Sequence, residues 1–81
     1  MKAIVTVGLK PGVLDVQGKA VANALKDLGF ADVENARVGK VIELELAHIA
    51  DRDEAHAQVT DMCEKLLANT VIESYRVEIA G

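Results

Sequence analysis

The sequence has few aromatic residues, and its acidic residues outnumber its basic ones. Phe30 and Tyr75 are the two aromatic side chains among 81 residues, and the net charge is −4 with histidine neutral. Proteins that bind single-stranded nucleic acid stack bases on several aromatic rings. Phosphate backbones also attract positive charge. We therefore do not expect this chain to bind nucleic acid.

The sequence is also poor in residues that form disulfides, bind metals or act as nucleophiles. Cys63 is the one cysteine, which excludes an internal disulfide framework and a thiolate-rich zinc site. His48 and His56 are not spaced as metal ligands on a helix face, and we interpret both as surface or boundary residues. Cys63 falls in an apolar stripe and is predicted to be a buried small side chain. We expect no catalytic, metal-binding or cofactor-binding residue.

Long apolar runs are missing as well. No stretch approaches the roughly 20 apolar residues that span a bilayer, and no signal-peptide pattern follows Met1. A chain of 81 residues has room for one small core. We expect a single cytoplasmic domain over residues 1–81, without a membrane partner.

The first half of the chain predicts a strand followed by a helix. β-branched residues alternate over residues 3–9, as in a half-buried strand, and Pro11 ends that pattern. Asp15 is the expected N-cap of the helix, and Gly29 is suited to the position just after its end. The apolar stripe of this helix consists of Ala20, Val21, Ala24, Leu25 and Leu28.

The middle and the end of the chain predict a hairpin, a second helix and a last strand. Residues 33–38 and 41–47 flank Gly39-Lys40, which fits a two-residue turn. A second helix begins near Asp51, and a strand follows over about residues 73–79. The apolar face of the second helix consists of Ala55, Val59, Met62, Cys63, Leu66 and Leu67.

The order strand, helix, strand, strand, helix, strand is typical of a ferredoxin-like βαββαβ sandwich. This α+β fold has a four-stranded antiparallel sheet with two helices on one face. The other face of the sheet is left open, and Ile4 and Val41 would lie on it among polar residues. We expect the chain to associate with itself through this sheet.

Several polar residues and glycines lie where simple packing does not require them. Caps, turns and solubility can explain each one, and a polar docking surface is the alternative. These residues are Lys10, Asp15, Gln17, Gly18, Arg37, Gly39, Lys40 and Glu43.

The same residues carry a family resemblance. Lys10-Pro11-Gly12-Val13-Leu14-Asp15-Val16-Gln17-Gly18, Leu28-Gly29-Phe30 and Arg37-Val38-Gly39-Lys40 closely resemble the PurS family. One departure is Val16, where the family commonly has proline at the first position of the helix. Valine still permits a helix there.

The resemblance implies a ferredoxin-like homodimer or homotetramer that is the small subunit of phosphoribosylformylglycinamidine synthase in purine biosynthesis. In such complexes a glutaminase subunit releases ammonia from glutamine. A synthetase subunit uses ATP and Mg²⁺ to convert formylglycinamide ribonucleotide to its amidine. The small subunit would bind no cofactor itself and would hold neither catalytic centre.

We predict that the small subunit orders the interface between the glutaminase and the synthetase. Asp15 would mainly cap the helix, and Glu43 would contact a second copy. The residues expected to dock the partners are Lys10, Gln17, Gly18, Arg37, Gly39 and Lys40. The alternative is a regulatory domain that resembles amino-acid-sensing ferredoxin-like modules, with a small-molecule site around Gly12 to Gly18.

Overall fold

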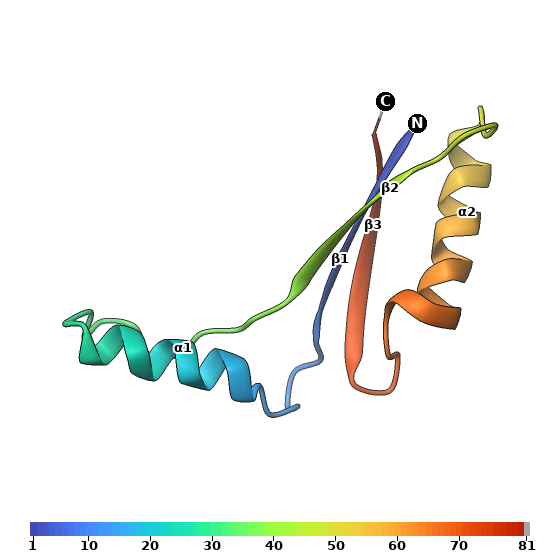
Figure 1. Cartoon of the computed structure of the whole chain (residues 1–81). Helices are drawn as coiled ribbons and strands as arrows, with labels where there is room; N and C mark the ends of the chain where they lie inside the picture. The colour runs from blue at the N-terminus through green and yellow to red at the C-terminus, as the bar shows by residue number, and fades with distance from the viewer. Residues whose placement is uncertain (81) are drawn as a thin grey trace.

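The computed structural model describes residues 1–80, which form an antiparallel sheet and two helices (Figure 1). The sheet has three strands in the order β2-β1-β3. A π-helical turn, η1, continues the second helix. The elements are β1 (Lys2–Leu9), α1 (Val16–Asp27), β2 (Lys40–Glu45), α2 (Arg52–Met62), η1 (Cys63–Leu67) and β3 (Glu73–Ala80).

The core lies between the sheet and α2. Alternate residues of the central strand β1 are buried because their side chains point to the same face of the sheet, and α2 covers that face. Cys63 is fully buried, as predicted, and its burial raises the pKa of the thiol. The buried apolar residues of this core are Ala3, Val5, Val7, Val59, Cys63 and Ala68.

One member of the predicted apolar face of the second helix is not in the core. Leu66 is 83% exposed, although its spacing from Val59 is helical. It lies in η1, where the backbone turn is wider than in an α-helix. This change of pitch rotates Leu66 away from the face that Val59 and Cys63 share.

The predicted strand at residues 33–38 is wrong, and so is the predicted turn at Gly39-Lys40. The structure has an extended, unpaired segment at 33–38 that runs directly into β2. The reason is local: the Val38 N–H donates to Asp15 Oδ2 at 2.8 Å, and the Arg37 guanidinium donates to the Leu9 carbonyl at 2.9 Å. These bonds hold the segment straight. The α+β class is confirmed, with three strands instead of four.

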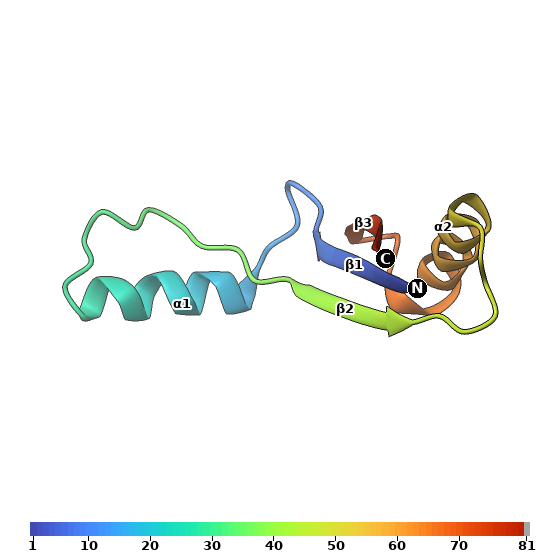
Figure 2. The same ribbon diagram turned by 90° about the horizontal axis from the view of Figure 1, so that it is seen from above.

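The prediction that two helices cover one face of the sheet is also wrong. In Figures 1 and 2, α1 projects away from the sheet, and residues 28–39 return alongside it. We call residues 10–39 the arm. The radius of gyration is 16.1 Å, whereas a compact chain of this length has about 12 Å. The described residues therefore form a small body, residues 1–9 and 40–80, and a protruding arm.

The arm has a local fold of its own. Asp15 caps α1 by accepting the Gly18 N–H, and Gly29 has a φ of +102° just after the helix ends, as the sequence predicted. Gly18 and Ala22 are the buried residues of α1. The predicted apolar stripe of α1 is largely exposed, with Val21 at 43% and Leu28 at 74%. The body of the same chain leaves this stripe uncovered.

The helices of residues 1–80 are too short or too polar to cross a bilayer.

We predict that Val59→Ala destabilises the body by about 2 kcal/mol, because it removes two buried methyl groups and leaves a cavity. Val59 is fully buried, whereas Val71 is 81% exposed, so Val71→Ala is the matched control. Urea unfolding monitored by circular dichroism measures both changes. An equal loss of stability in the two variants would contradict this assignment of the core.

Candidate functional site

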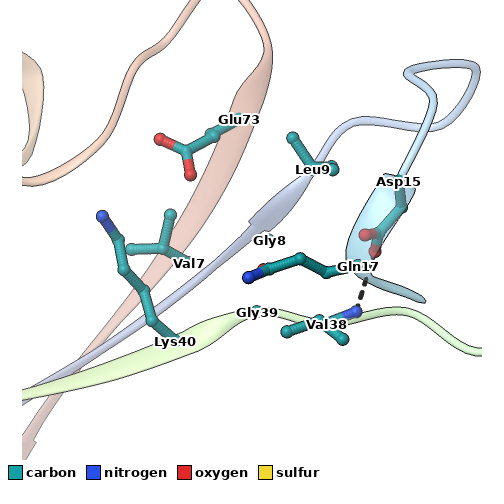
Figure 3. Close-up of a pocket in the computed structure, with 9 residues that line it drawn as sticks. All are labelled: Val7, Gly8, Leu9, Asp15, Gln17, Val38, Gly39, Lys40 and Glu73. Carbon is teal, nitrogen blue, oxygen red and sulfur yellow. Dashed lines mark hydrogen bonds between the residues drawn. The ribbon is translucent and has the colours of Figure 1, made fainter. Parts of the chain in front are cut away.

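A cleft of about 200 Å³ lies where the arm joins the sheet (Figure 3). The end of β1, the start of α1, the start of β2 and the start of β3 meet there. Gln17 and Lys40 extend their side chains beside it in Figure 3. The residues that line the cleft are Val7, Gly8, Leu9, Asp15, Gln17, Val38, Gly39, Lys40 and Glu73.

The Asp15 carboxylate joins the two halves of the arm at its base. Its oxygens accept the Gly18 N–H at 2.7 Å and the Val38 N–H at 2.8 Å. These two backbone hydrogen bonds, with a smaller contribution from the nearby Arg37 charge, lower the pKa of Asp15 below its ordinary value. A carboxylate with two amide donors and a lowered pKa is a poor general base. Asp15 is therefore a structural residue here.

Two basic residues predicted to dock a partner form hydrogen bonds within the chain. Arg37 donates to the carbonyls of Leu9 at 2.9 Å and Lys10 at 3.3 Å. The Lys10 ammonium donates to the Thr70 carbonyl at 2.7 Å, and the Lys10 backbone N–H donates to the Ile72 carbonyl. These bonds tie the arm to the end of β1 and to the loop before β3.

Two glycines allow the backbone to come close at the base of the arm. A Cβ atom on Gly18 would overlap the Ala36 carbonyl oxygen and the Asp15 carboxylate, and one on Gly39 would lie 2.5 Å from the Val7 carbonyl oxygen. No side chain fits at either position. Gly18 and Gly39 therefore set the position of the arm.

The structure brings only part of the predicted docking set together. Gln17, Gly39 and Lys40 line the cleft, whereas Arg37 lines a second groove between α1 and the returning segment. Lys10 and Gly18 border neither. The predicted dimer residue Glu43 lies in the middle of β2, where it pairs with Lys2 at 3.3 Å.

The sequence interpretation missed Glu73. This residue lies opposite Leu9 in the β1–β3 pairing, which brings it to the cleft from the far end of the chain. Its carboxylate accepts the Asn69 N–H at 2.7 Å. No local pattern around Glu73 indicates this position, because it depends on the register between strands that are distant in sequence.

The chemistry of the cleft is that of a binding surface. Its polar side chains are Asp15, Gln17, Lys40 and Glu73, and Asp15 is already occupied by amide donors. Within residues 1–80, no three histidine, cysteine, aspartate or glutamate side chains gather as metal ligands do. The arrangement can orient a polar partner: the Lys40 ammonium can bind an acidic group, and the Gln17 amide can donate or accept a hydrogen bond.

We predict that the base of the arm loosens as pH falls through the lowered pKa of Asp15. The carboxylate is deprotonated above that value, so the stabilisation is present at higher pH and is lost on protonation. A titration by NMR should show the Gly18 and Val38 amide resonances following one midpoint below the ordinary aspartate pKa.

Asp15→Asn should abolish this titration of the two amides. Asp32→Asn, a change in the same arm at an exposed residue, should leave it as in the unmodified chain. A midpoint above the ordinary aspartate value would contradict the hydrogen-bond assignment.

Comparisons with known proteins agree with one another. The sequence profile of the family PurS, described as phosphoribosylformylglycinamidine (FGAM) synthase, matches residues 2–81. The chain is 50% identical over 78 residues to phosphoribosylformylglycinamidine synthase subunit PurS of Bacillus subtilis, covering 96% of this chain and 90% of that protein.

Solved structures of such proteins are similar in fold. The PurS structure from Bacillus subtilis has a TM-score of 0.86 at 47% identity and covers 99% of this chain and 98% of its own. A chain in the PurLQS structure from Thermotoga maritima has a TM-score of 0.85 at 31% identity and covers 95% and 93%.

The matches extend over almost the whole chain, and the family match at residues 2–81 spans the segments that form the base of the arm. The agreement in fold has the same extent, so it covers the arm as well as the body. The chain belongs to the PurS family, whose members are subunits of phosphoribosylformylglycinamidine synthase in purine biosynthesis.

Proposed function

We propose that this chain is a non-catalytic assembly subunit of phosphoribosylformylglycinamidine synthase. Membership of the PurS family over residues 2–81 carries this proposal. The cleft at the base of the arm supports it, because its side chains can bind a partner, its two carboxylates accept backbone N–H groups, and serine, threonine, cysteine and histidine are absent from its lining. The isolated chain should have no turnover.

The partners are a glutaminase subunit of the PurQ type and a synthetase subunit of the PurL type. A related chain is part of the PurLQS structure from Thermotoga maritima, which supports this choice. Glutamine would bind to the glutaminase, and ATP with Mg²⁺ to the synthetase. Ammonia would then convert formylglycinamide ribonucleotide to its amidine, in the cytoplasm.

A scaffold contributes to such a reaction by holding the glutaminase and synthetase active sites in a fixed relative position. Free ammonia diffuses away and becomes unreactive ammonium in bulk water. Holding the two larger subunits together raises the effective concentration of the intermediate at the second site. This role needs a rigid surface with specific contacts, and the arm anchored by Asp15 provides one.

We assign the partner contacts to the cleft side chains that have no hydrogen bond or ion pair within residues 1–80. These are Gln17 and Lys40, and Lys40 would meet an acidic group of a larger subunit. The roles of the other predicted docking residues are to place the arm: Lys10 and Arg37 through hydrogen bonds, and Gly18 and Gly39 through close approach.

The chain is also proposed to be a homo-oligomer, either a dimer or a tetramer. Its α1 stripe is exposed in the single chain, together with Leu14, Val16 and Phe30, which are 72%, 70% and 58% exposed. An exposed apolar surface of this kind on a protruding element marks an interaction site. Self-association would cover it.

We predict that Lys40→Glu lowers glutamine-dependent synthesis by at least tenfold in a complex reconstituted from three separately purified subunits. Reversal of this charge replaces an attraction with a repulsion at the interface. Activity with ammonium chloride in place of glutamine should fall much less, because the synthetase centre is untouched.

The matched control is Lys19→Glu, which makes the same charge change in the groove between α1 and the returning segment. It should keep most of the glutamine-dependent activity. Full activity of Lys40→Glu would overturn the docking assignment. Turnover by the isolated chain would overturn the non-catalytic role itself.

A further inference from the structure

Glu73 is the charged cleft residue to which the proposed function gives no role. Its side chain is fixed to the turn before β3, because Oε1 accepts the Asn69 N–H at 2.7 Å and the Glu73 N–H donates to the Asn69 carbonyl at 2.7 Å. Within residues 1–80, Oε2 of Glu73 has no hydrogen bond and no ion pair. One oxygen of this carboxylate is therefore free to bind a donor.

The other carboxylate of the cleft is different. Both oxygens of Asp15 accept backbone N–H groups, those of Gly18 and Val38, so this carboxylate is already satisfied. In the cleft lining, Oε2 of Glu73 is thus the one carboxylate oxygen that no donor of residues 1–80 occupies. A carboxylate held by one oxygen loses little conformational freedom when the other oxygen binds a partner.

The strand register places Glu73 and Lys40 on opposite sides of β1 but on the same face of the sheet. Lys40 pairs with Val7, and Glu73 pairs with Leu9. Paired residues share a face, and so do alternate residues along β1, so both side chains lie on the face of the buried Val7. Two strand spacings and an offset of two residues put the Lys40 and Glu73 Cα atoms roughly 12 Å apart.

The two opposite charges of the cleft do not neutralise each other. Lys40 and Glu73 form no ion pair in the structure, and Figure 3 shows their side chains extending from β2 and β3, with Gln17 extending from α1. The cleft therefore has a positive side, a negative side and an amide that can donate or accept. Such a surface is complementary to a partner segment that brings both charges, and it disfavours the reversed orientation, which places like charges together.

We propose that Glu73 binds a basic side chain of the same larger subunit whose acidic group meets Lys40. This inference rests on the docking role assigned to the cleft above. A lysine alone attracts an acidic segment in either direction, whereas the two charges together favour one direction. Glu73 thus sets the orientation of the docked subunit, which a scaffold needs in order to hold two active sites in a fixed relative position.

The alternative role of Glu73 is structural. Its bond to the Asn69 N–H holds the turn before β3 whether or not a partner binds. Charge and hydrogen bonding can be separated at this position, because a glutamine keeps a side-chain oxygen that accepts the Asn69 N–H but removes the charge. A purely structural role therefore predicts that Glu73→Gln behaves as the unmodified chain does.

Titration of the chain into the complex tests the inference. Increasing amounts of the unmodified or variant chain are added to fixed amounts of the glutaminase and synthetase subunits, and glutamine-dependent synthesis is measured. Glu73→Gln should raise the half-saturating concentration of the chain at least fivefold, because a charge-assisted hydrogen bond at the interface is lost. The rate at saturation should be unchanged, since neither catalytic centre is altered.

The matched control is Glu54→Gln. Glu54 lies on α2, outside the cleft lining, and accepts a hydrogen bond from Gln58 Nε2 at 3.2 Å, which a glutamine can also accept. This variant makes the same change of charge and should keep the half-saturating concentration within twofold of the unmodified value. The thermal unfolding midpoint of Glu73→Gln should also match that of the unmodified chain, because the bond to Asn69 is kept.

A charge swap tests whether Lys40 and Glu73 serve only each other. Lys40→Glu/Glu73→Lys keeps the sum of the two charges and reverses their direction. Its half-saturating concentration should be at least tenfold above the unmodified value, because each charge then faces a like charge of the partner. Recovery of the unmodified value in the swapped chain would show that the two residues only neutralise each other, which contradicts the inference.

The single variants separate this inference from the proposed function. An unchanged titration of Glu73→Gln, together with an impaired Lys40→Glu, would overturn the role of Glu73 alone. Unchanged titrations of both variants would overturn the docking role of the cleft as well. Loss of the fold in Glu73→Gln would show that the charge serves the turn before β3, and this result also overturns the inference.

Discussion

The fold of the arm depends on one carboxylate. Asp15 accepts the N–H groups of Gly18 and Val38, and through them it fixes the first turn of α1 to the segment that returns to the sheet. Arg37 and Lys10 reinforce the same junction from the end of β1. Without the Asp15 bridge, α1 and the returning segment would have little to hold them at the base, since α1 packs on no strand of its own sheet.

The straight path set by Asp15 has a consequence for association. A chain that turned at Gly39 would pair residues 33–38 with its own β2 and close its own sheet. The bonds to Val38 and Arg37 prevent that turn, so the strand edge and the apolar stripe of α1 stay open. The single chain is thus left incomplete in two places. A partner can cover both the strand edge and the α1 stripe, as expected for a subunit of a larger complex.

Local features of the sequence predicted much of this structure. The helices, the first and last strands, the Asp15 cap and the burial of Cys63 follow from periodicity and capping chemistry, which act over a few residues. The sequence predicted a strand at 33–38, and the structure has an extended backbone there without the predicted pairing partner. Likewise, the α1 stripe predicted a buried surface, whereas the body of the same chain leaves this stripe exposed. Pairing and packing of distant segments depend on contacts that no short pattern encodes.

The candidate site divides in the same way. The polar residues and glycines of the segments Lys10–Gly18 and Arg37–Lys40 predicted a docking surface. Most of these residues lie at the base of the arm. The roles of these residues were harder to predict. The sequence does not show whether a lysine or arginine donates to a carbonyl of its own chain or to another protein. Glu73 reaches the cleft only through the β1–β3 register, and the change of pitch at η1 had no signal in the spacing of apolar residues.

The arm is held at its base by its own chain, and we propose that a second copy buries its exposed apolar surface. Amide hydrogen exchange at a series of protein concentrations tests this proposal most directly. Protection of α1 should rise with concentration, while α2, packed on its own sheet, should exchange at a constant rate. Concentration-independent protection throughout α1 would contradict the proposal.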